Sequence, residues 1–254
     1  MCGRYTMTDP DAILDELAPL GVSASEEEVV PRYNIAPSQR AVVVASDDPR
    51  RLVKARWGLV PPWAHKRKPA DRAPKPLINA RAETAATKPS FRDGVKRRRC
   101  LVVADGYYEW KADGAKKRPF YFRARNGRPF VFAGLWAAGP APGAGEGDDR
   151  GTPERGFDRL GPAERSFAIL TTSADALVSP IHDRMPVILG DEARQRWLFA
   201  AELTADDVSA IVENADPPAL ETYPVAPAVG SPANDDPRCV EPLPTQPELF
   251  GPRG

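Results

Sequence analysis

The sequence predicts an α+β fold, a single domain built on mostly antiparallel β-sheet with peripheral helices. Two observations lead to this prediction. Most of the predicted strands are short, and several are joined by turn dipeptides rather than by helices. Helical periodicity is found only near the N-terminus and in two segments after residue 190. A chain of 254 residues can bury one substantial core, so we expect one domain that carries insertions.

The first predicted element is a helix near the N-terminus. The segment Thr8-Asp9-Pro10 is expected to cap it, with Pro10 in its first turn, and Ala12, Ile13 and Leu17 follow at helical spacing. The helix is expected to end near residue 21. Cys2 therefore lies on a short segment ahead of a helix.

Seven short runs, rich in β-branched or aromatic residues, predict the strands that follow. They cover residues 41–45, 51–59, 100–104, 107–111, 119–125, 129–136 and 166–172. The dipeptides Asp113-Gly114 and Asn126-Gly127 favour hairpin turns. Residues 107–136 are therefore predicted to form an antiparallel meander.

Two helices and one insertion complete the prediction. Asp191 and Thr204 are expected to cap helices over about 191–200 and 204–214. Residues 139–164 are rich in Gly, Pro and charge, and they offer too little apolar surface to offset the entropy of ordering, which predicts a flexible insertion. The domain is expected to span residues 2–243, with a disordered tail over 244–254.

Charge and cysteine content exclude several classes of protein. Lys+Arg and Asp+Glu balance at 35 each, so any surface for nucleic acid must come from local basic clusters, such as residues 65–68, 96–99 and 116–118. Three cysteines without CxxC spacing and only two histidines argue against a metal site and a secreted disulfide framework. No apolar run is long enough to span a membrane. We expect a cytoplasmic monomer that needs no cofactor.

Cys2 has a chemistry that internal cysteines lack. An initiator Met before a small residue is readily removed, which leaves a thiol and a free α-amine on one residue. With pKa values of about 8.5 and about 7.7–8.0, both groups are partly reactive near neutral pH. An aldehyde condenses with such an amine to an imine, after which the thiol adds to the same carbon and closes a thiazolidine ring. The alternative interpretation is a frayed terminus with no such role.

Three other polar residues lie in contexts that a structural role explains less well. Asn79 follows a Pro-rich loop in a segment that alternates polar and apolar residues. Glu109 is flanked by aromatic residues, and His182 lies in a turn bracketed by prolines. Taken separately, each also fits a structural role, as a turn former, as the outward face of an edge strand and as a loop residue.

Together with Cys2, these residues fall in six segments that resemble, in the same order, the motifs of the SOS-response-associated peptidase (SRAP) family. The segments are Cys2–Tyr5, Arg32–Pro37, Trp57–Pro61, Ile78–Thr84, Ala104–Trp110 and Ile181–Pro186. The resemblance extends from residue 2 to about residue 243. Six blocks in the right order are far more specific than any one of them.

The resemblance implies a role in DNA repair. Members of this family expose an N-terminal cysteine and trap the ring-opened aldehyde of an abasic site in single-stranded DNA as a thiazolidine. Cys2 is thereby implied to form the crosslink, and Asn79 to hold its amine or the sugar. Glu109 would shuttle protons, with a pKa raised by its aromatic neighbours, and His182 would act on the opened sugar or the 3′ phosphate.

The resemblance also implies a set of DNA contacts. They are Arg4, Pro37, Trp63, Arg81, Thr171 and Arg184. The arginines would bind phosphates beside the lesion, while Pro37 and Trp63 would stack on bases or wedge between them. Trp57 and Trp110 are candidates for stacking as well, but packing in the core is an equal alternative for both.

The chain departs from the family pattern in two places. Many relatives carry a second aromatic residue directly after the position of Trp63, where this chain has Ala64, followed by the basic residues 65–68. Gly230-Ser231-Pro232 stands where an asparagine-bearing strand is usual, which puts any DNA contact from that segment in doubt.

Two other functions stay open from the sequence. A thiol peptidase would use Cys2 as its nucleophile, with His182 and either Glu109 or Asn79. A non-covalent module for single-stranded DNA would use the basic and aromatic residues, but it leaves these four residues unexplained. A peptidase needs the thiol alone, whereas a crosslinking protein needs thiol and amine on the same residue.

Overall fold

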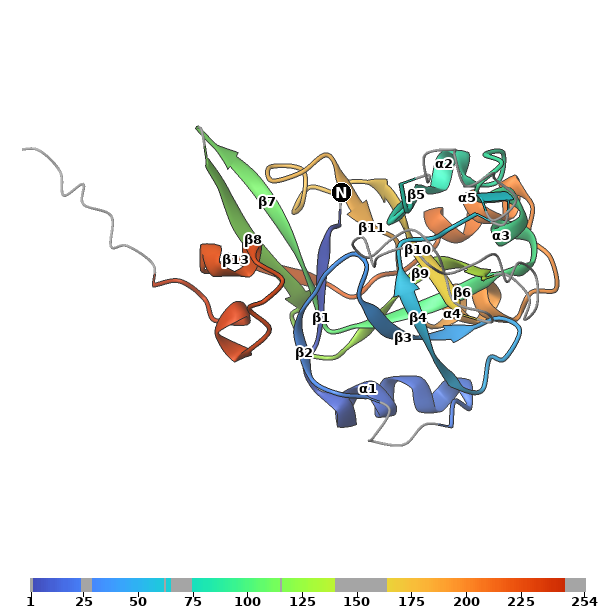
Figure 1. Ribbon diagram of the computed structural model, residues 1–254, viewed down its shortest axis with the longest axis horizontal. Coiled ribbons are helices and arrows are strands. Elements are labelled where there is room, and N and C mark those ends of the chain that lie inside the picture. The colour runs from blue at the N-terminus through green and yellow to red at the C-terminus, as the bar shows by residue number, and fades with distance from the viewer. Residues whose placement is uncertain are drawn as a thin grey trace, which may run out of the picture.

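Two β-sheets form the body of the protein, whose computed structural model describes residues 2–23, 29–61, 63–64, 75–114, 116–139 and 164–244 (Figure 1). One sheet has five strands in the order β13-β8-β7-β1-β2. These strands are β1 (Arg4–Met7), β2 (Arg32–Ile35), β7 (Gly106–Asp113), β8 (Lys116–Ala124) and β13 (Leu220–Pro224). All of their pairings are antiparallel.

The second sheet has eight strands, in the order β11-β10-β4-β3-β6-β9-β12 with β5 beside β10. They are β3 (Arg40–Ala45), β4 (Leu52–Trp57), β5 (Asn79–Arg81), β6 (Arg99–Ala104), β9 (Phe130–Ala138), β10 (Arg165–Ser173), β11 (Arg184–Pro186) and β12 (Ile188–Leu189). Because β10 pairs with both β4 and β9, the strands β10, β4, β3, β6 and β9 close into a ring. Only the pairings of β10 with β4 and β5 are parallel among the named strands, so the predicted α+β fold on mostly antiparallel sheet is confirmed.

Helices cover the ends of the sheets. They are α1 (Pro10–Leu17), α2 (Ala82–Ala85), α3 (Arg92–Arg97), α4 (Asp191–Phe199) and α5 (Ala205–Glu213), with short 3₁₀ turns at Ala18–Leu20, Pro227–Gly230 and Pro237–Val240. In Figure 1, α1 lies below the sheets and the other four helices gather on the right. No helix in the described part of the chain is long and apolar enough to cross a membrane.

Two of the three predicted helix caps are confirmed. Asp9 accepts the backbone N–H of Ala12 at 3.0 Å, and Thr204 forms a reciprocal capping box with Asp207. The third is wrong, because Gly190 caps α4 and Asp191 is its first helical residue. A Cβ at Gly190 would lie 2.4 Å from a backbone oxygen, so this close approach requires glycine.

The predicted meander over residues 107–136 is correct only for its first half. Asp113-Gly114 joins β7 to β8 as a hairpin, with Gly114 at a positive φ of 60°. The turn at Asn126-Gly127 does not form a hairpin, because β8 lies in the five-stranded sheet and β9 pairs with β6, β10 and β12 in the other. A turn dipeptide specifies the local reversal, but the long-range partners of each strand decide its sheet.

The predicted insertion and tail fall mostly outside the described residues, which omit 140–163 and 245–254. The two ends of the insertion meet. The backbone N–H of Gly139 donates to the carbonyl of Glu164 at 2.6 Å, and Ala138 pairs with Arg165. Strands β9 and β10 are therefore joined directly at the base of this segment.

Candidate functional site

The pairing of β1 with β7 brings Cys2 beside Glu109. Arg4 pairs with Tyr108 and Tyr5 with Tyr107, so continuing the register sets Gly3 against Glu109. Cys2 is fully buried, and its Sγ donates to the carbonyl of Arg4 across 3.7 Å. A thiol and a carboxyl from distant parts of the chain thus lie at the same end of the five-stranded sheet.

A buried aspartate anchors the strand that carries Cys2. The carboxylate of Asp105 accepts hydrogen bonds from the hydroxyls of Thr6 and Thr8, and from the N–H groups of Thr8 and Asp9. Gly106 follows it because a Cβ there would lie 2.1 Å from the hydroxyl of Tyr121. These residues hold β1 in place and so help to position Cys2, which precedes it.

Asn79 reaches Cys2 from the other sheet. It is the first residue of β5, which runs parallel to β10, and its Nδ2 donates to the carbonyl of Cys2 at 2.8 Å. Trp57 supports the segment just before it, since its indole N–H donates to the carbonyl of Ile78 at 2.9 Å. Trp57 is fully buried and stacked on Phe167. Of the two roles considered for it, stacking on a base or packing in the core, the structure shows packing in the core.

Glu109 is buried, with an exposed fraction of 2%. Burial raises the pKa of its carboxyl to about 7, and Asp183 adds to this rise. Burial also raises the pKa of the Cys2 thiol, and the Glu109 carboxylate raises it further. Near neutral pH, Glu109 can therefore both take up and release a proton, while the thiol needs a base.

His182 lies in the turn between β10 and β11. The carboxylate of Asp175 accepts the N–H groups of Leu177 and Val178 and orders this turn. Nδ1 of His182 accepts the backbone N–H of Arg184 at 3.0 Å. The same nitrogen lies 2.9 Å from a carboxylate oxygen of Asp183, and these two groups form an ion pair only when the ring is protonated. Because burial lowers the pKa of His182, the neutral ring is favoured near pH 7, with its proton on Nε2.

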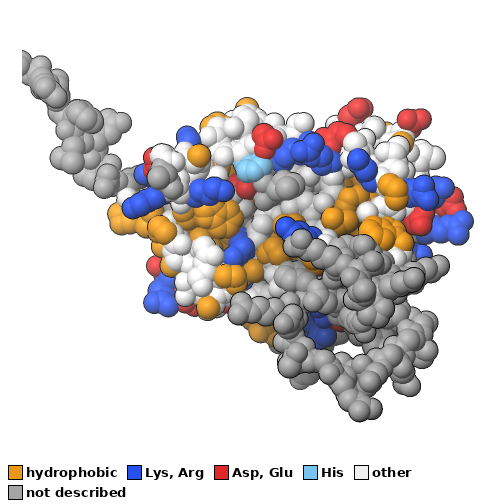
Figure 2. Space-filling model, turned by 45° about the horizontal axis from the view of Figure 1, so that its top comes forward, with side chains coloured by type: hydrophobic (Ala, Val, Ile, Leu, Met, Phe, Trp, Pro, Cys, Tyr) orange, Lys and Arg blue, Asp and Glu red, His pale blue; other side chains and the backbone are white. Residues whose placement is uncertain are grey.

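The face around this turn carries opposite charges close together. Figure 2 shows the coloured histidine at the surface, with Lys and Arg side chains on both sides of it and acidic side chains next to it. Cys2 is fully buried.

The three predicted arginines occupy different environments. Arg81 is exposed at the end of β5. Arg4 is half-buried and donates to the carbonyls of Gly3 and Gly230, each at 3.1 Å. The prediction that all three bind phosphate stays a prediction, although only Arg81 presents an exposed side chain.

Arg184 is nearly buried and holds an ion pair. Its two terminal nitrogens lie 2.7 and 2.9 Å from the carboxylate oxygens of Glu83, which lowers the pKa of that carboxyl. One of them also donates to the carbonyl of Thr171 at 2.6 Å. Thr171 is fully buried, and its hydroxyl donates to the carbonyl of Ala80 at 3.4 Å. These contacts tie β11 to β10 and β5, next to Asn79.

The two predicted base contacts lie near the surface. Trp63 has an exposed fraction of 44%, and Pro37 is half-buried in the turn after β2. The backbone N–H of Ser38 in that turn donates to the carbonyl of Trp57 at 2.8 Å. Ala64 is half-buried, whereas the basic residues 65–68 lie outside the described part of the chain.

Asn34 has a structural role that the sequence did not reveal. It is fully buried, and its Nδ2 lies 2.7–3.0 Å from the carbonyls of Val229, Ser231 and Asn234. Asp235 in turn accepts the N–H groups of Tyr33 and Asn34. The Gly230–Pro232 segment is thus docked on β2. A buried asparagine in a strand was the available signal, but its partners lie about 200 residues away.

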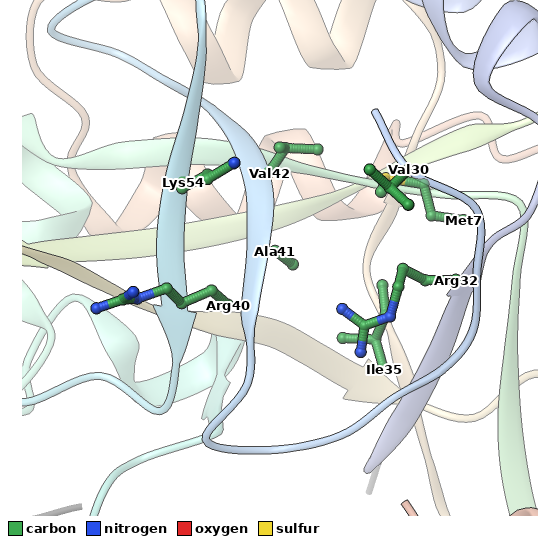
Figure 3. A pocket seen from close by; sticks show the side chains of 8 residues that line it. All are labelled: Met7, Val30, Arg32, Ile35, Arg40, Ala41, Val42 and Lys54. Atoms are coloured by element: carbon green, nitrogen blue, oxygen red, sulfur yellow. The ribbon is translucent and has the colours of Figure 1, made fainter. Parts of the chain in front are cut away.

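Two hollows lie elsewhere on the described surface. One, of about 310 Å³, has Arg32 and Ile35 facing Ala41 and Val42, with Lys54 on the neighbouring strand (Figure 3). The other, of about 410 Å³, is lined by the basic residues 116–118 and by Pro224 and Leu243. Neither hollow is lined by Cys2, Asn79, Glu109 or His182. The described residues contain no cluster of His, Cys, Asp or Glu suited to a metal ion.

At the second residue of the chain, a buried thiol thus lies beside the Asn79 amide and a carboxyl of raised pKa, that of Glu109. The chain belongs to the SOS response associated peptidase (SRAP) family, whose model matches residues 1–232. This agrees with the resemblance of its six sequence segments.

Several relatives are similar over most of their length. The abasic site processing protein YoqW of Bacillus subtilis is 36% identical over 95% of this chain and 99% of its own. YedK of Escherichia coli, of the same description, is 32% identical over 96% of this chain and 100% of its own. A crystal structure of a protein from Bacteroides thetaiotaomicron shares the fold, with a TM-score of 0.73 at 24% identity over 95% of this chain and 100% of its own.

Proposed function

We propose that this protein processes abasic sites in DNA by trapping their ring-opened aldehyde covalently on Cys2. The observation that carries the proposal is the arrangement at Cys2, where the Asn79 amide holds the backbone carbonyl and Glu109 lies beside the thiol. The names of the relatives, which are abasic site processing proteins, support the substrate.

Removal of Met1 frees the amine of Cys2 for the first step. The amine attacks the aldehyde carbon, and the resulting carbinolamine loses water to give an imine. Glu109 supplies the proton that the departing hydroxyl needs, because with a pKa of about 7 it is partly protonated near neutral pH. Asn79 fixes the Cys2 backbone, which limits the directions in which the amine can approach.

Ring closure follows on the same carbon. The thiol of Cys2 gives its proton to the Glu109 carboxylate, and the sulfur then forms a bond to the protonated imine carbon. In this proposal His182, with its proton on Nε2, donates to the opened sugar or to a phosphate next to it. The thiazolidine leaves both the amine and the sulfur bonded to the lesion.

The DNA partner in this proposal is single-stranded, and one cytoplasmic monomer is enough to form the site. The three residues of the site come from one chain, since Asn79 lies on β5, Glu109 lies on β7 and Cys2 precedes the segment that forms β1. Arg81 would contact a phosphate directly, and Trp63 would stack on a base. A flexible single strand can bend into a buried site more easily than a stacked duplex.

A peptidase is the less favoured function for this site. A peptidase needs only the thiol of Cys2, whose pKa burial and Glu109 both raise, and it gives no role to the amine that removal of Met1 frees on the same residue. We assign one peptide cleavage to the site, the hydrolysis that removes Met1. Hydrolysis is then limited to the bond between Met1 and Cys2, and any lyase activity is limited to the DNA in the adduct.

Intact mass spectrometry with a single-stranded oligonucleotide that carries one abasic site tests this function. The wild-type protein should lack Met1 and gain the mass of the oligonucleotide less water. Cys2→Ala should form no denaturation-resistant adduct, and Cys2→Ser should form at most an imine that borohydride traps. A stable adduct on protein that retains Met1 would contradict the mechanism.

A further inference from the structure

Tyr107 carries a buried hydroxyl that the fold does not explain. Its side chain has an exposed fraction of 0%, and its hydroxyl has no hydrogen-bond partner among the residues that the structure describes. Leaving a buried hydroxyl unsatisfied costs about 1–3 kcal/mol. Phenylalanine would fill the same apolar surroundings without this cost. The hydroxyl is therefore a candidate for a role in the reaction.

Packing fixes the direction of the Tyr107 ring. It stacks on Phe122, its cross-strand neighbour in β8, with centroids 4.8 Å apart and an angle of 9° between the planes. The edge of Phe132 meets it at 6.1 Å and 78°. A ring held on two sides keeps its hydroxyl in one place, which is what a donor to a reacting atom requires.

The strand register places this ring beside the reacting groups. Tyr107 is two residues before Glu109 on β7, so both side chains lie on the same face of the sheet. Tyr107 also pairs directly with Tyr5 on β1, three residues after Cys2. The ring therefore lies on the same strand and face as Glu109, and opposite Tyr5 of β1, the strand that Cys2 precedes.

The charges around the hydroxyl distinguish Tyr107 from Tyr5, which is also fully buried and whose hydroxyl likewise has no hydrogen-bond partner among the described residues. After burial, the groups that raise the pKa of Tyr107 are Cys2, Glu109 and Asp175. For Tyr5 they are Cys2 and Cys100, while Arg32 acts in the opposite direction. Both rings thus lie near Cys2, but Tyr107 also lies near Glu109 and near Asp175, which orders the turn that holds His182.

We propose that the Tyr107 hydroxyl donates a hydrogen bond to the sulfur of Cys2 when that sulfur ionises, and so promotes thiazolidine closure. The inference rests on the covalent function proposed above. The thiol proton passes to the Glu109 carboxylate, and a sulfur electron pair forms the new C–S bond. The C=N electrons move to the nitrogen, which becomes the neutral ring amine. Tyr107 keeps its own proton throughout, and the substrate aldehyde is the only co-reactant.

The test measures the two steps separately in the full-length protein and in Tyr107→Phe. Borohydride traps the imine on an abasic oligonucleotide, and the denaturation-resistant adduct formed without borohydride reports ring closure. The variant should form the imine at the wild-type rate and close the ring about tenfold to a hundredfold more slowly, because it lacks one hydrogen bond to a charged sulfur. The fraction of protein–DNA complex that is present as the imine, and that borohydride can therefore trap, should rise accordingly.

Tyr5→Phe is the matched control, because it removes the other buried hydroxyl of the same cross-strand pair. It should close the ring at the wild-type rate. Neither substitution should lower the thermal midpoint, since each removes an unpartnered polar atom without leaving a cavity larger than that atom. Ring closure by Tyr107→Phe at the wild-type rate, or equal slowing by both variants, would overturn the inference. A wild-type protein that forms no adduct would instead refute the proposed function.

Discussion

The side-chain amide of Asn79 donates a hydrogen bond to the backbone carbonyl of Cys2 across 2.8 Å. The two residues belong to different sheets, since Asn79 begins β5 of the eight-stranded sheet and Cys2 precedes β1 of the five-stranded sheet. The position of Cys2 therefore depends on how the two sheets pack. A thiol so close to the chain end would otherwise sample many conformations, and this bond restricts them.

Replacing Asn79 with aspartate tests this role. Aspartate has nearly the same shape but presents oxygen instead of N–H, so it cannot donate to the Cys2 carbonyl at neutral pH. We expect Asn79→Asp to slow adduct formation by about tenfold or more while DNA affinity changes little. Single-turnover crosslinking at saturating oligonucleotide measures the rate. A change in affinity alone would show that Asn79 binds DNA rather than Cys2.

Glu109→Gln separates the effects of proton transfer and burial. The pKa of Glu109 is raised from its ordinary value of 4.5 to about 7 in the folded protein. The stabilising contribution of its proton is therefore fully present below about pH 4.5 and is lost as pH rises through about 7. At pH 8 the variant should be more stable to urea than the wild type by roughly 3 kcal/mol, with no difference at pH 4.5.

The same variant should lose the proton carrier of the reaction. Its crosslinking rate should fall by about a hundredfold and lose the pH dependence centred near 7. A stability difference that is equal at both pH values would show that burial of the carboxylate is not its cause. A rate that keeps its pH dependence would point to another group, such as His182, as the proton carrier.

Local sequence patterns predicted the parts of the fold that depend on local interactions. The caps at Asp9 and Thr204 and the hairpin at Asp113-Gly114 follow from side chains and turn preferences within a few residues. The turn at Asn126-Gly127 was misassigned because its flanking strands find partners in different sheets. Short strands such as β1 and β5 have too few residues to show an alternating pattern, and only their pairing reveals them.

The candidate site was also predicted only in part, because local sequence patterns do not reveal which distant residues lie together. Cys2 stood out from its position alone, and Asn79, Glu109 and His182 from their unusual contexts. Their spatial relations depend on strand register and on contacts between segments about 70 to 100 residues apart. The ion pair of Arg184 with Glu83 shows a consequence of this, because the sequence marks both residues as charged but not as partners.

The arginines are predicted to differ in their contribution to DNA binding. Arg81 is exposed, so Arg81→Ala should weaken binding to single-stranded DNA and reduce the slope of log K against log salt by about 0.7. Arg184 is engaged by Glu83, so Glu83→Gln should strengthen binding if the guanidinium also contacts phosphate. Fluorescence anisotropy across a salt series measures both. Unchanged affinity in Glu83→Gln, with lower stability, would assign Arg184 a structural role alone.

Arg99 is predicted to be essential for stability and dispensable for the reaction. It is buried, and its guanidinium donates to the carbonyls of Val95 and Lys96 at the end of α3 and to those of Trp197 and Ala200 at the end of α4. Arg99→Met leaves these carbonyls without a donor and should lower the free energy of unfolding by about 3 kcal/mol or more. The crosslinking rate at low temperature should stay near that of the wild type, and a marked loss in folded protein would contradict this.

Residues 140–163 are predicted to be dispensable for folding and for crosslinking. Gly139 and Glu164 already hydrogen bond to each other at 2.6 Å, so a short Gly-Ser linker can replace the segment between them. Glu164 must be kept, because its carboxylate pairs with Arg40 and Arg56. The shorter loop should change the unfolding free energy by only about 1 kcal/mol, since closure entropy varies slowly with length. The thermal midpoint and the crosslinking rate of the deletion variant decide the matter. A midpoint lower by many degrees would mean that the segment packs on the core, and a slower rate at unchanged stability would mean that it helps to hold DNA.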